Sequence, residues 1–439
     1  MPLSDHALSA WLARQAYSLL LRLGTPAYLW RVWARGCEEP AYRAHWPWRL
    51  GLYGRAYRGR LLPQPGPCVW VHAVSLGEAR AAAPLIQALR VACPGMRLVL
   101  THTTATGREA GRALLQPGDV QTWLPYDTPG AVRRFLAVHR PAVGVLMETE
   151  VWPNLQHEAV RSGVPMVLAN ARLSEKSLRQ GQRLSALMRP AARALALCLA
   201  QTQADADRLR AMGASRVEVA GNVKFDMQPD ETLLARGRAW RVDARPVVLA
   251  ASTREGEEPD LLAAWQNLPL DRRPRLFIVP RHPQRFDEVA KAVQAAGFTL
   301  SRRSTWPQSG PDATACAADV WLGDTMGEMP AYYAAADVAL LGGSFAPLGG
   351  QNLIEAAACG CPVVMGPSTF NFALAAELSE AAGAAHRVSD WRAGVNEAVR
   401  LTEPGARAQA SAAALAFAVS HRGAAQRMAQ AVAALIARV

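Results

Sequence analysis

Glu78 is the acidic residue whose position most directly suggests chemistry. It follows a glycine where the β-rich segment CVWVHAV, residues 68–74, gives way to the helix-forming segment EARAAAPLIQALR, residues 78–90. Ligands of open α/β sheets bind at the C-terminal ends of strands, beside helix N-termini, so a carboxylate there could act as a general base. Taken alone, the pattern favours a structural role, because an acidic residue in the first turn stabilises the helix dipole.

A glycine-rich segment, ALLGGSFAPLGGQNLIEAA, gives the strongest sign of nucleotide binding. Two glycine pairs, Gly342–Gly343 and Gly349–Gly350, separate an apolar strand-like run from a helix that begins near Asn352. Glycines let backbone N–H groups approach an anion, and the helix N-terminus adds positive potential. Glu355 could accept hydrogen bonds from a ribose diol. The segment contains neither a GK[ST] loop nor a GxGxxG fingerprint, and a glycine-rich structural turn is the alternative.

Three further apolar segments end in polar residues that could contact a ligand. Residues 142–150 (AVGVLMETE) end in two acids, and residues 275–285 end in the basic sequence PRHPQR. Arg281 and His282 suit a phosphate, with a solvated basic loop as the alternative. The backbone at Met326–Glu328 could read the edge of a base, and a plain capping turn explains the same pattern.

Composition points to a folded chain with anionic partners. The 439 residues predict two domains of about 200 residues each. The formal net charge is +12, with only three lysines among 48 basic residues, and it favours phosphates or acidic lipid. No dense basic run or RNA-binding aromatic motif supports nucleic acid. The seven cysteines form no CxxC pair, so we expect a reducing compartment and no zinc site.

The first 60 residues differ from the rest of the chain. They hold five of the 13 tryptophans, five of the eight tyrosines and nine arginines against three acids. Arginines interrupt every apolar run before it reaches the roughly 18 residues of a spanning helix, and we expect Pro26 to break the helix. Trp, Tyr and Arg mixed with Leu are typical of a segment that lies at a membrane interface. An ordinary helix packed on a domain is one alternative, and an N-terminal span with flanking arginines is another.

Apolar strand-like runs alternate with helical patterns along the remaining chain. This alternation predicts an α/β fold with two doubly wound, parallel-sheet domains. We assign residues 1–62 to a membrane-associating segment, 63–230 to the first Rossmann-like domain and 231–404 to the second. Residues 405–439 are alanine-rich, and we expect them to form helices that pack back on the first domain.

Eleven motifs in register resemble those of the Kdo (3-deoxy-D-manno-octulosonic acid) transferases. They are HAVSLGE, THTTATG, METEVWPNL, NARLSEKS, GNVKFD, STREGEE, RHPQRF, GDTMGEM, GGSF, GGQNLIEAA and GPSTFNF, across roughly residues 40–372. The resemblance implies an inverting glycosyltransferase of the GT-B architecture. Its donor would be CMP-Kdo and its acceptor the lipid A precursor (lipid IVA), at the cytoplasmic face of the inner membrane.

The resemblance also assigns roles to residues of this chain. Glu78 matches the general base, one of Glu148 and Glu150 matches an acidic position near the reaction centre, and Lys224 matches a position that stabilises charge in the transition state. The implied CMP contacts are Pro280, Arg281, His282, Met326, Gly327, Glu328, Asn352, Leu353, Ile354 and Glu355. No metal, cofactor, nucleic acid or obligate protein partner is expected. A sugar-nucleotide epimerase on the same architecture and a non-catalytic, membrane-surface nucleotide-binding protein are the competing interpretations.

Overall fold

The computed structural model describes residues 5–59, 61 and 66–437. The chain divides into two compact units: the first comprises Met1–Asp226 with Gly423–Val439, and the second comprises Met227–Arg422. Each unit is built on a parallel sheet covered by helices. The expected α/β class with two doubly wound domains is therefore confirmed.

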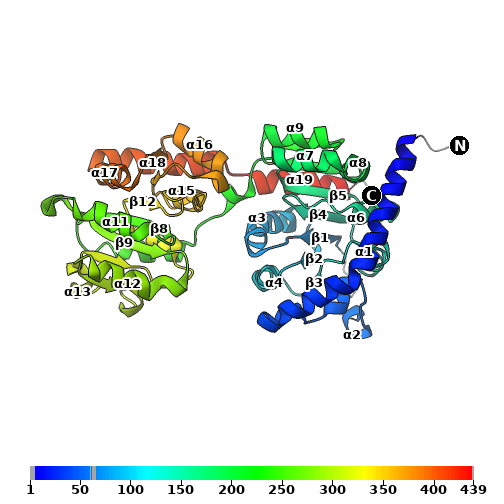
Figure 1. Cartoon of the computed structure of the whole chain (residues 1–439), viewed down its shortest axis with the longest axis horizontal. Coiled ribbons are helices and arrows are strands. Elements are labelled where there is room, and N and C mark those ends of the chain that lie inside the picture. The colour runs from blue at the N-terminus through cyan, green and yellow to red at the C-terminus, as the bar shows by residue number, and fades with distance from the viewer. Residues whose placement is uncertain (1–4, 60, 62–65, 438–439) are drawn as a thin grey trace. The chain divides into compact units, whose positions relative to one another are not determined.

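The sheet of the first unit has parallel strands whose central members are buried on both faces. Its strands are β1 (Cys68–His72), β2 (Arg97–His102), β3 (Val120–Trp123), β4 (Val143–Met147), β5 (Met166–Ala171), β6 (Leu197–Ala200) and β7 (Val217–Val219). They run in the order β3-β2-β1-β4-β5-β6-β7, and Figure 1 shows β3, β2, β1, β4 and β5 following one another. The order reverses between β1 and β4, which is the switch point where open sheets bind ligands.

Helices cover both faces of this sheet because successive strand residues point to opposite sides. Val69 and Val71 of β1 join one apolar core with α3, while Trp70 joins the other with Phe135 of α5. The helices are α3 (Leu76–Ala92), α4 (Ala105–Gly111), α5 (Pro129–His139), α6 (Pro153–Arg161), α7 (Glu175–Arg183), α8 (Ser185–Arg193) and α9 (Gln203–Met212), with 3-10 turns η3 (Arg112–Leu114) and η4 (Val223–Asp226).

The N-terminal helix α1 (Asp5–Glu38) is continuous, so the expected break at Pro26 was wrong. Proline removes one backbone donor, but Thr25 Oγ1 donates to the Leu21 carbonyl at 2.8 Å beside it. The helix is also held on the unit: Ser18 Oγ donates to Asn154 Oδ1 at 2.9 Å, and Tyr17 OH donates to Asp127 Oδ2 at 3.0 Å. Packing of this kind outweighs the local cost of the proline.

The segment after α1 forms three short helical elements in the same unit. These are η1 (Pro40–Tyr42), η2 (Trp46–Leu50) and α2 (Arg55–Arg58). The Trp123 indole donates to the Ala44 carbonyl at 2.8 Å, which ties this segment to β3. None of the helices in the described ranges combines the length and apolarity needed to cross a membrane.

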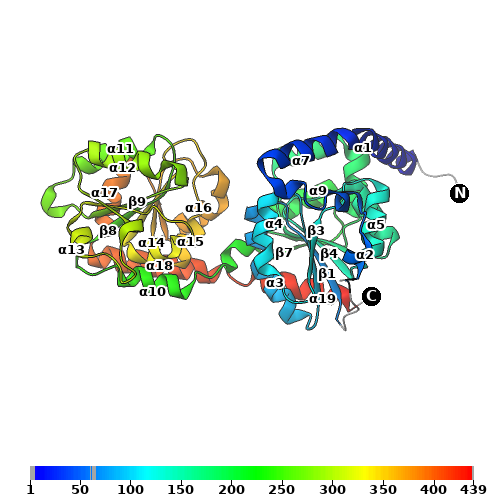
Figure 2. The ribbon, with the colours of Figure 1, turned by 90° about the horizontal axis from the view of Figure 1, so that it is seen from below.

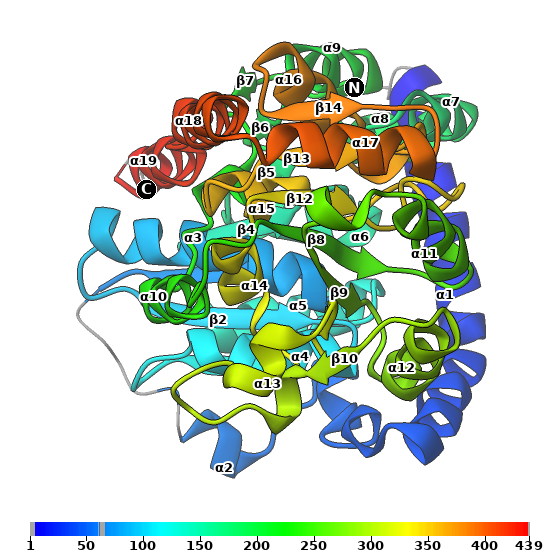
Figure 3. The ribbon, with the colours of Figure 1, turned by 90° about the vertical axis from the view of Figure 1, so that its left-hand side faces the viewer.

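The second unit repeats the plan of the first. Its strands are β8 (Val247–Thr253), β9 (Arg275–Pro280), β10 (Leu300–Arg302), β11 (Val320–Leu322), β12 (Val338–Leu341), β13 (Val363–Met365) and β14 (Ala385–Arg387). Their order is β10-β11-β9-β8-β12-β13-β14, and Figure 3 shows β14 and β10 near opposite edges. The switch point lies between β8 and β12, next to the glycine-rich segment.

Helices cover this sheet as well. They are α10 (Glu231–Ala239), α11 (Glu257–Gln266), α12 (Phe286–Ala295), α13 (Ala313–Ala317), α14 (Met329–Ala335), α15 (Leu353–Ala358), α16 (Ala373–Ala381), α17 (Trp391–Leu401) and α18 (Pro404–Ser420), with 3-10 turns η5 (Leu270–Arg272), η6 (Pro283–Arg285), η7 (Arg303–Thr305) and η8 (Phe370–Phe372). Trp265 and Leu261 of α11 are buried against the strands in its main apolar core.

The two C-terminal helices belong to different units. We expected both to pack on the first domain, but α18 contacts α15 and α17 of the second unit. Only α19 (Ala424–Ile436) returns to the first unit, where it packs against α3, as Figure 2 shows. The Asp226 carboxylate accepts hydrogen bonds from the N–H groups of Gly423 and Ala425. Asp226 ends the first part of this unit and Gly423 begins its second part, so these hydrogen bonds join the two points at which the chain leaves and re-enters the unit.

Candidate active site

Glu78 lies in the first turn of α3, whose N-cap is Ser75. Ser75 Oγ accepts from the Glu78 N–H at 3.4 Å, and Glu78 Oε2 accepts from the Val74 N–H at 2.8 Å. This exchange, similar to a capping box, fixes the carboxylate at the end of β1. Burial raises the pKa of Glu78 to about 7; the Val74 hydrogen bond opposes this rise, and the charges of Glu148 and Glu150 add to it. Glu78 is thus a helix cap whose protonation changes near neutral pH.

Glu148 follows β4 in an uncommon backbone conformation, with φ of 59°. Its N–H donates to the Ala169 carbonyl at 2.9 Å, which fixes the turn. Its Oε1 lies 3.6 Å from Lys224 Nζ and its Oε2 lies 3.4 Å from Arg172 Nε. The carboxylate therefore lies between two cations and holds the Lys224 ammonium at this end of the sheet.

Glu150 is the third carboxylate at this switch point. Its Oε2 accepts from the Trp152 indole at 2.7 Å and lies 3.9 Å from His72 Nε2. Burial lowers the pKa of His72 to about 3, so the imidazole is neutral at pH 7. Burial also raises the pKa of Glu150, and the charge of Glu148 adds to that rise. Glu150 therefore has a neutral neighbour rather than a cationic partner in His72.

The structure brings the four predicted catalytic residues to one end of one sheet. Glu78 follows β1, Glu148 and Glu150 follow β4, and Lys224 lies in η4 after β7. The pKa of Glu78 responds to both other carboxylates, which places the three charges near one another.

Two residues of this cluster were missed from the sequence. Asn170 (φ 51°) is buried, and its Oδ1 accepts from the Val223 N–H at 3.2 Å, which positions the turn that carries Lys224. Arg172, two residues further on, pairs with Glu148. Both belong to the motif NARLSEKS, but only the fold reveals partners so distant in the sequence.

At the switch point of the second unit, a buried carboxylate joins the segments that follow β8 and β12. Glu257 accepts from the Gly343 N–H at 2.9 Å and 2.8 Å with its two oxygens, and from the Arg254 N–H at 2.9 Å. Gly343 has φ of 70°, which favours glycine, and a Cβ on Gly342 would lie 2.3 Å from the Ser252 carbonyl oxygen. The glycine pair is therefore required by the close approach of the segments that follow β8 and β12.

The predicted CMP contacts at 352–355 form the start of α15. Asn352 is the N-cap and accepts from the Ile354 N–H at 3.2 Å. Leu353 and Ile354 are buried in the core, so their side chains pack inside the unit rather than facing a ligand. Glu355 is partly exposed in the first turn. In this segment, a ligand could contact the Glu355 side chain and the backbone.

The predicted contacts at 326–328 lie in the turn before α14. Met326 is 65% exposed and Gly327 has φ of 82°. The Glu328 carboxylate accepts from Arg236 at 2.9 Å and from Arg303 at 3.0 Å. Burial alone would raise its pKa, but hydrogen bonds from Thr325 and the two arginines, together with the charge of Arg303, lower it. Because the side chain of Glu328 is already engaged, this turn offers mainly backbone to a ligand.

The predicted contacts at 280–282 end β9. The Arg281 N–H donates to the Thr253 carbonyl at 2.9 Å, which links this turn to the end of β8. The Arg281 side chain is exposed, and His282 Nε2 lies 4.0 Å from Glu255 Oε1. The nearby Arg285 forms a buried, two-pronged ion pair with Glu258, at 2.8 Å for each hydrogen bond. The motif RHPQRF therefore combines an exposed arginine with a structural one.

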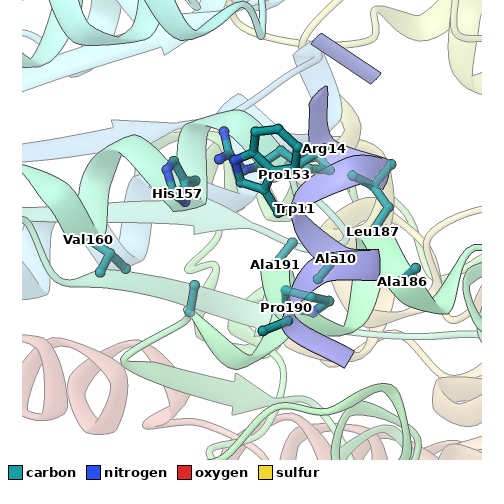
Figure 4. A pocket seen from close by; sticks show the side chains of 12 residues that line it. Ala10, Trp11, Arg14, Pro153, His157, Val160, Ala186, Leu187, Pro190 and Ala191 are labelled. Carbon is teal, nitrogen blue, oxygen red and sulfur yellow. The ribbon is translucent and has the colours of Figure 1, made fainter. Parts of the chain in front are cut away.

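An apolar groove lies apart from all these residues. It has a volume of about 350 Å³ and is bordered by Trp11 and Arg14 of α1, His157 of α6 and Leu187 of α8, as Figure 4 shows. None of the predicted site residues lines it. In the described ranges, no group of three or more His, Cys, Asp or Glu side chains is placed to hold a metal ion.

Comparison with known proteins decides the family. Residues 44–227 match a family model described as 3-deoxy-D-manno-octulosonic-acid transferase. The chain is 49% identical over 432 residues to the 3-deoxy-D-manno-octulosonic acid transferase of Bordetella pertussis, covering 95% of this chain and 98% of that protein. The chain belongs to the Kdo transferase family. It is therefore a glycosyltransferase that transfers Kdo. It is also 34% identical over 364 residues to the Haemophilus influenzae enzyme of the same name, covering 81% and 82% of the two chains.

Solved structures of distant relatives share the fold of this Kdo transferase. A UDP-GlcNAc 2-epimerase from Neisseria meningitidis aligns with a TM-score of 0.56 at 15% identity, covering 85% of this chain and 100% of that one. A glycosyltransferase from Rickettsia africae aligns with a TM-score of 0.57 at 10% identity, covering 85% and 99%. At such identities the likeness establishes the two-domain architecture and leaves the reaction to the residues of the site.

Proposed function

We propose that this Kdo transferase moves Kdo from CMP-Kdo to the lipid A precursor, an acylated and phosphorylated glucosamine disaccharide, in lipopolysaccharide synthesis. The observation that carries the proposal is Glu78, a carboxyl group at the switch point of the first unit. In the described part of the chain, its one hydrogen bond is that from Val74, through Oε2. Oε1 is therefore available to a substrate hydroxyl. With its pKa raised to about 7, the group is suited to take a proton near neutral pH.

The proposed step is a direct displacement with inversion. The Glu78 carboxylate accepts the proton of the acceptor hydroxyl while that oxygen bonds to the anomeric carbon of Kdo. The bond from this carbon to the CMP phosphate breaks, and its electron pair leaves with the phosphate. The products are the new glycoside, CMP and protonated Glu78, which returns its proton to water.

Lys224 and Glu148 have supporting roles in this proposal. The donor carries negative charge on both its phosphate and its sugar carboxylate, and the Lys224 ammonium provides a compact positive charge close to Glu148. Glu148 positions this ammonium from one side, while Asn170 positions the backbone of the turn that carries it. Lys224 therefore stabilises charge while Glu78 moves the proton.

The second unit is the proposed CMP site. Arg281 offers a guanidinium with exposed donors for the phosphate. The backbone at Met326–Glu328 is proposed to contact the base, and the partly exposed Glu355 carboxylate is proposed to contact the ribose. This division of roles separates the donor residues from the acceptor residues, as the two-domain architecture favours.

The test is product analysis with purified enzyme. Wild-type protein, CMP-Kdo and the lipid A precursor are expected to give the Kdo-bearing glycolipid, seen as a mass increase by mass spectrometry. Glu78→Gln keeps an oxygen that can accept from Val74 but cannot take a proton, so we expect turnover to fall by about 10²–10⁴-fold. A wild-type enzyme that releases only epimerised nucleotide sugar would overturn the proposal.

We also propose that α1 holds the enzyme on the cytoplasmic face of the inner membrane. Leu20, Leu23 and Trp30 lie on one side of α1 and are 68%, 71% and 73% exposed, while Ser18 on the opposite side is buried. An exposed stripe of Leu and Trp is the arrangement of helices that lie in a membrane interface.

Vesicle sedimentation tests the role of this stripe. The variant L20Q/L23Q/W30Q should remain in the supernatant with phosphatidylglycerol-containing vesicles that sediment the wild type. The control V91Q/V242Q/L270Q changes three apolar residues elsewhere that are 82%, 55% and 81% exposed, and it should sediment normally. Equal sedimentation of both variants would contradict the assignment.

A further inference from the structure

A second cavity of the first unit, distinct from the apolar groove, includes in its wall the residue that donates to the proposed base. It has a volume of about 450 Å³, and its wall includes Val74 and Glu150. The Val74 N–H is the group that donates to Glu78, and Glu150 is the carboxylate beside His72. The opposite wall is formed by α1 and the segment that follows it. The cavity therefore joins the N-terminal helix to the reaction centre.

Two arginines of α1 line this cavity. Arg31 and Arg35 are four residues apart, so they lie one above the other on the same side of the helix. Both side chains are exposed, and Arg35 contacts the Tyr42 ring at 5.8 Å. In the described ranges, neither guanidinium forms an ion pair with a carboxylate. Their donors are therefore available to an anion that enters the cavity.

A third arginine of the wall, Arg49, is buried. Its side chain is 2% exposed, it lies over the Trp123 ring at 3.8 Å, and its Nη1 donates to Tyr28 OH at 3.1 Å. Its Nε and Nη2 have no hydrogen-bond partner among the residues that the structure describes. A buried guanidinium without an anion is costly, and the aromatic contact offsets only part of this cost. Arg49 therefore lacks the anion that a buried guanidinium ordinarily has.

The acids of the same wall do not supply this anion. Asp127 accepts from the Leu155 N–H at 2.7 Å, the Asn154 N–H at 3.1 Å and Tyr17 OH at 3.0 Å. Glu150 accepts from Trp152. Burial raises the pKa of both carboxyl groups, to about 7 for Asp127, so burial disfavours the negative charge of each. Three arginines against these two acids leave the cavity with a net positive charge.

We propose that Arg31 and Arg35 bind a phosphate monoester of the acceptor sugar, and that the buried Arg49 adds its positive charge to the site. The inference rests on the proposed function and extends it: α1 is a wall of the acceptor site and not only a membrane contact. Guanidinium groups match the geometry of phosphate oxygens, and the cavity that would hold the phosphate reaches Glu150 and Val74, the residue that donates to Glu78. The enzyme thereby selects a phosphorylated acceptor over an unphosphorylated one.

The test compares two acceptors with two variants. The acceptors are the lipid A precursor with its phosphates and the same lipid after enzymatic dephosphorylation, both in detergent micelles. For R31Q/R35Q, we expect KM for the phosphorylated acceptor to rise about ten-fold or more, with little change in kcat, because charge-assisted hydrogen bonds are lost. KM for the dephosphorylated acceptor should not change. The control R22Q removes a charge from the same helix outside the cavity and should alter neither KM.

Vesicle binding separates an acceptor phosphate from a lipid headgroup. R31Q/R35Q should still sediment with phosphatidylglycerol vesicles that contain no acceptor. Loss of vesicle binding, with KM raised equally for both acceptors, would show that these arginines bind the bilayer and would overturn the inference. A wild-type enzyme with the same KM for both acceptors would overturn it as well, while leaving Kdo transfer intact. Only failure of the wild type to modify either acceptor would count against the proposed function itself.

Discussion

At the scale of single residues, the pKa of Glu78 predicts the pH profile of the enzyme. The base must be ionised to accept a proton, so kcat/KM should rise with pH and level off above about 7. Steady-state kinetics from pH 5 to 9 measure this directly. A profile already level at pH 5 would assign the proton transfer to a group other than Glu78.

The same raised pKa predicts that Glu78 lowers stability as pH increases. The folded protein binds this proton more tightly than the unfolded chain, whose carboxyl has its ordinary value of 4.5. The contribution is therefore favourable below the unfolded value and is lost as pH rises to about 7. We expect Glu78→Gln to have a higher melting temperature than the wild type at pH 8, with the difference shrinking at pH 5. Glu109→Gln, an exposed change in α4, is the control and should show no such trend.

The sequence predicted the acidic residues of the candidate active site, but it did not predict Arg172, which pairs with Glu148. Glu78, Glu148 and Glu150 could be selected because each follows an apolar strand-like run. Arg172 could not, because its pairing with Glu148 depends on two strands lying side by side. Arg49 carried no signal at all, since burial and the absence of an anion are properties of the folded chain.

At the scale of elements, the segments that follow β8 and β12 approach too closely for a side chain at Gly342. A Cβ there would lie 2.3 Å from the backbone oxygen of Ser252. Gly342→Ala should therefore destabilise the second unit by about 1–3 kcal/mol, measured by urea unfolding. Gly405→Ala is the matched control: its Cβ meets nothing within 4 Å, and alanine favours helix α18. Equal stability of the two variants would contradict the close approach.

The elements that the sequence predicted well are the buried ones. Strands such as β1 and β4 appear as apolar runs because both faces of a central parallel strand are covered. Two edge strands carry little of this apolar signal: β10 and β14 have three residues each, and most of these are polar and only partly buried. The continuous helix through Pro26 was also beyond local rules, because tertiary contacts with Asp127 and Asn154 hold it.

At the scale of the whole molecule, the first unit depends on a helix from the far end of the chain. Met428 of α19 is fully buried against α3 and the sheet. Met428→Ala should destabilise the first unit by about 2–5 kcal/mol and leave the second unit unaffected. Hydrogen exchange followed by mass spectrometry measures the stability of each unit separately, through peptides from β1–β5 for the first unit and from β8–β12 for the second. Gln430→Ala, exposed on the same helix, should change neither, and faster exchange in the second unit after Met428→Ala would contradict the division.

The position of α19 also sets an order of events during synthesis. The ribosome completes the whole second unit, residues 227–422, before it delivers the helix that covers one face of the first sheet. At a synthesis rate of about 5–20 residues per second, that apolar face remains uncovered for roughly 10–40 s. Throughout this interval the nascent first unit therefore exposes apolar surface, which favours aggregation until α19 docks. Docking of α19, whose first N–H groups are accepted by Asp226, is the step that completes the enzyme.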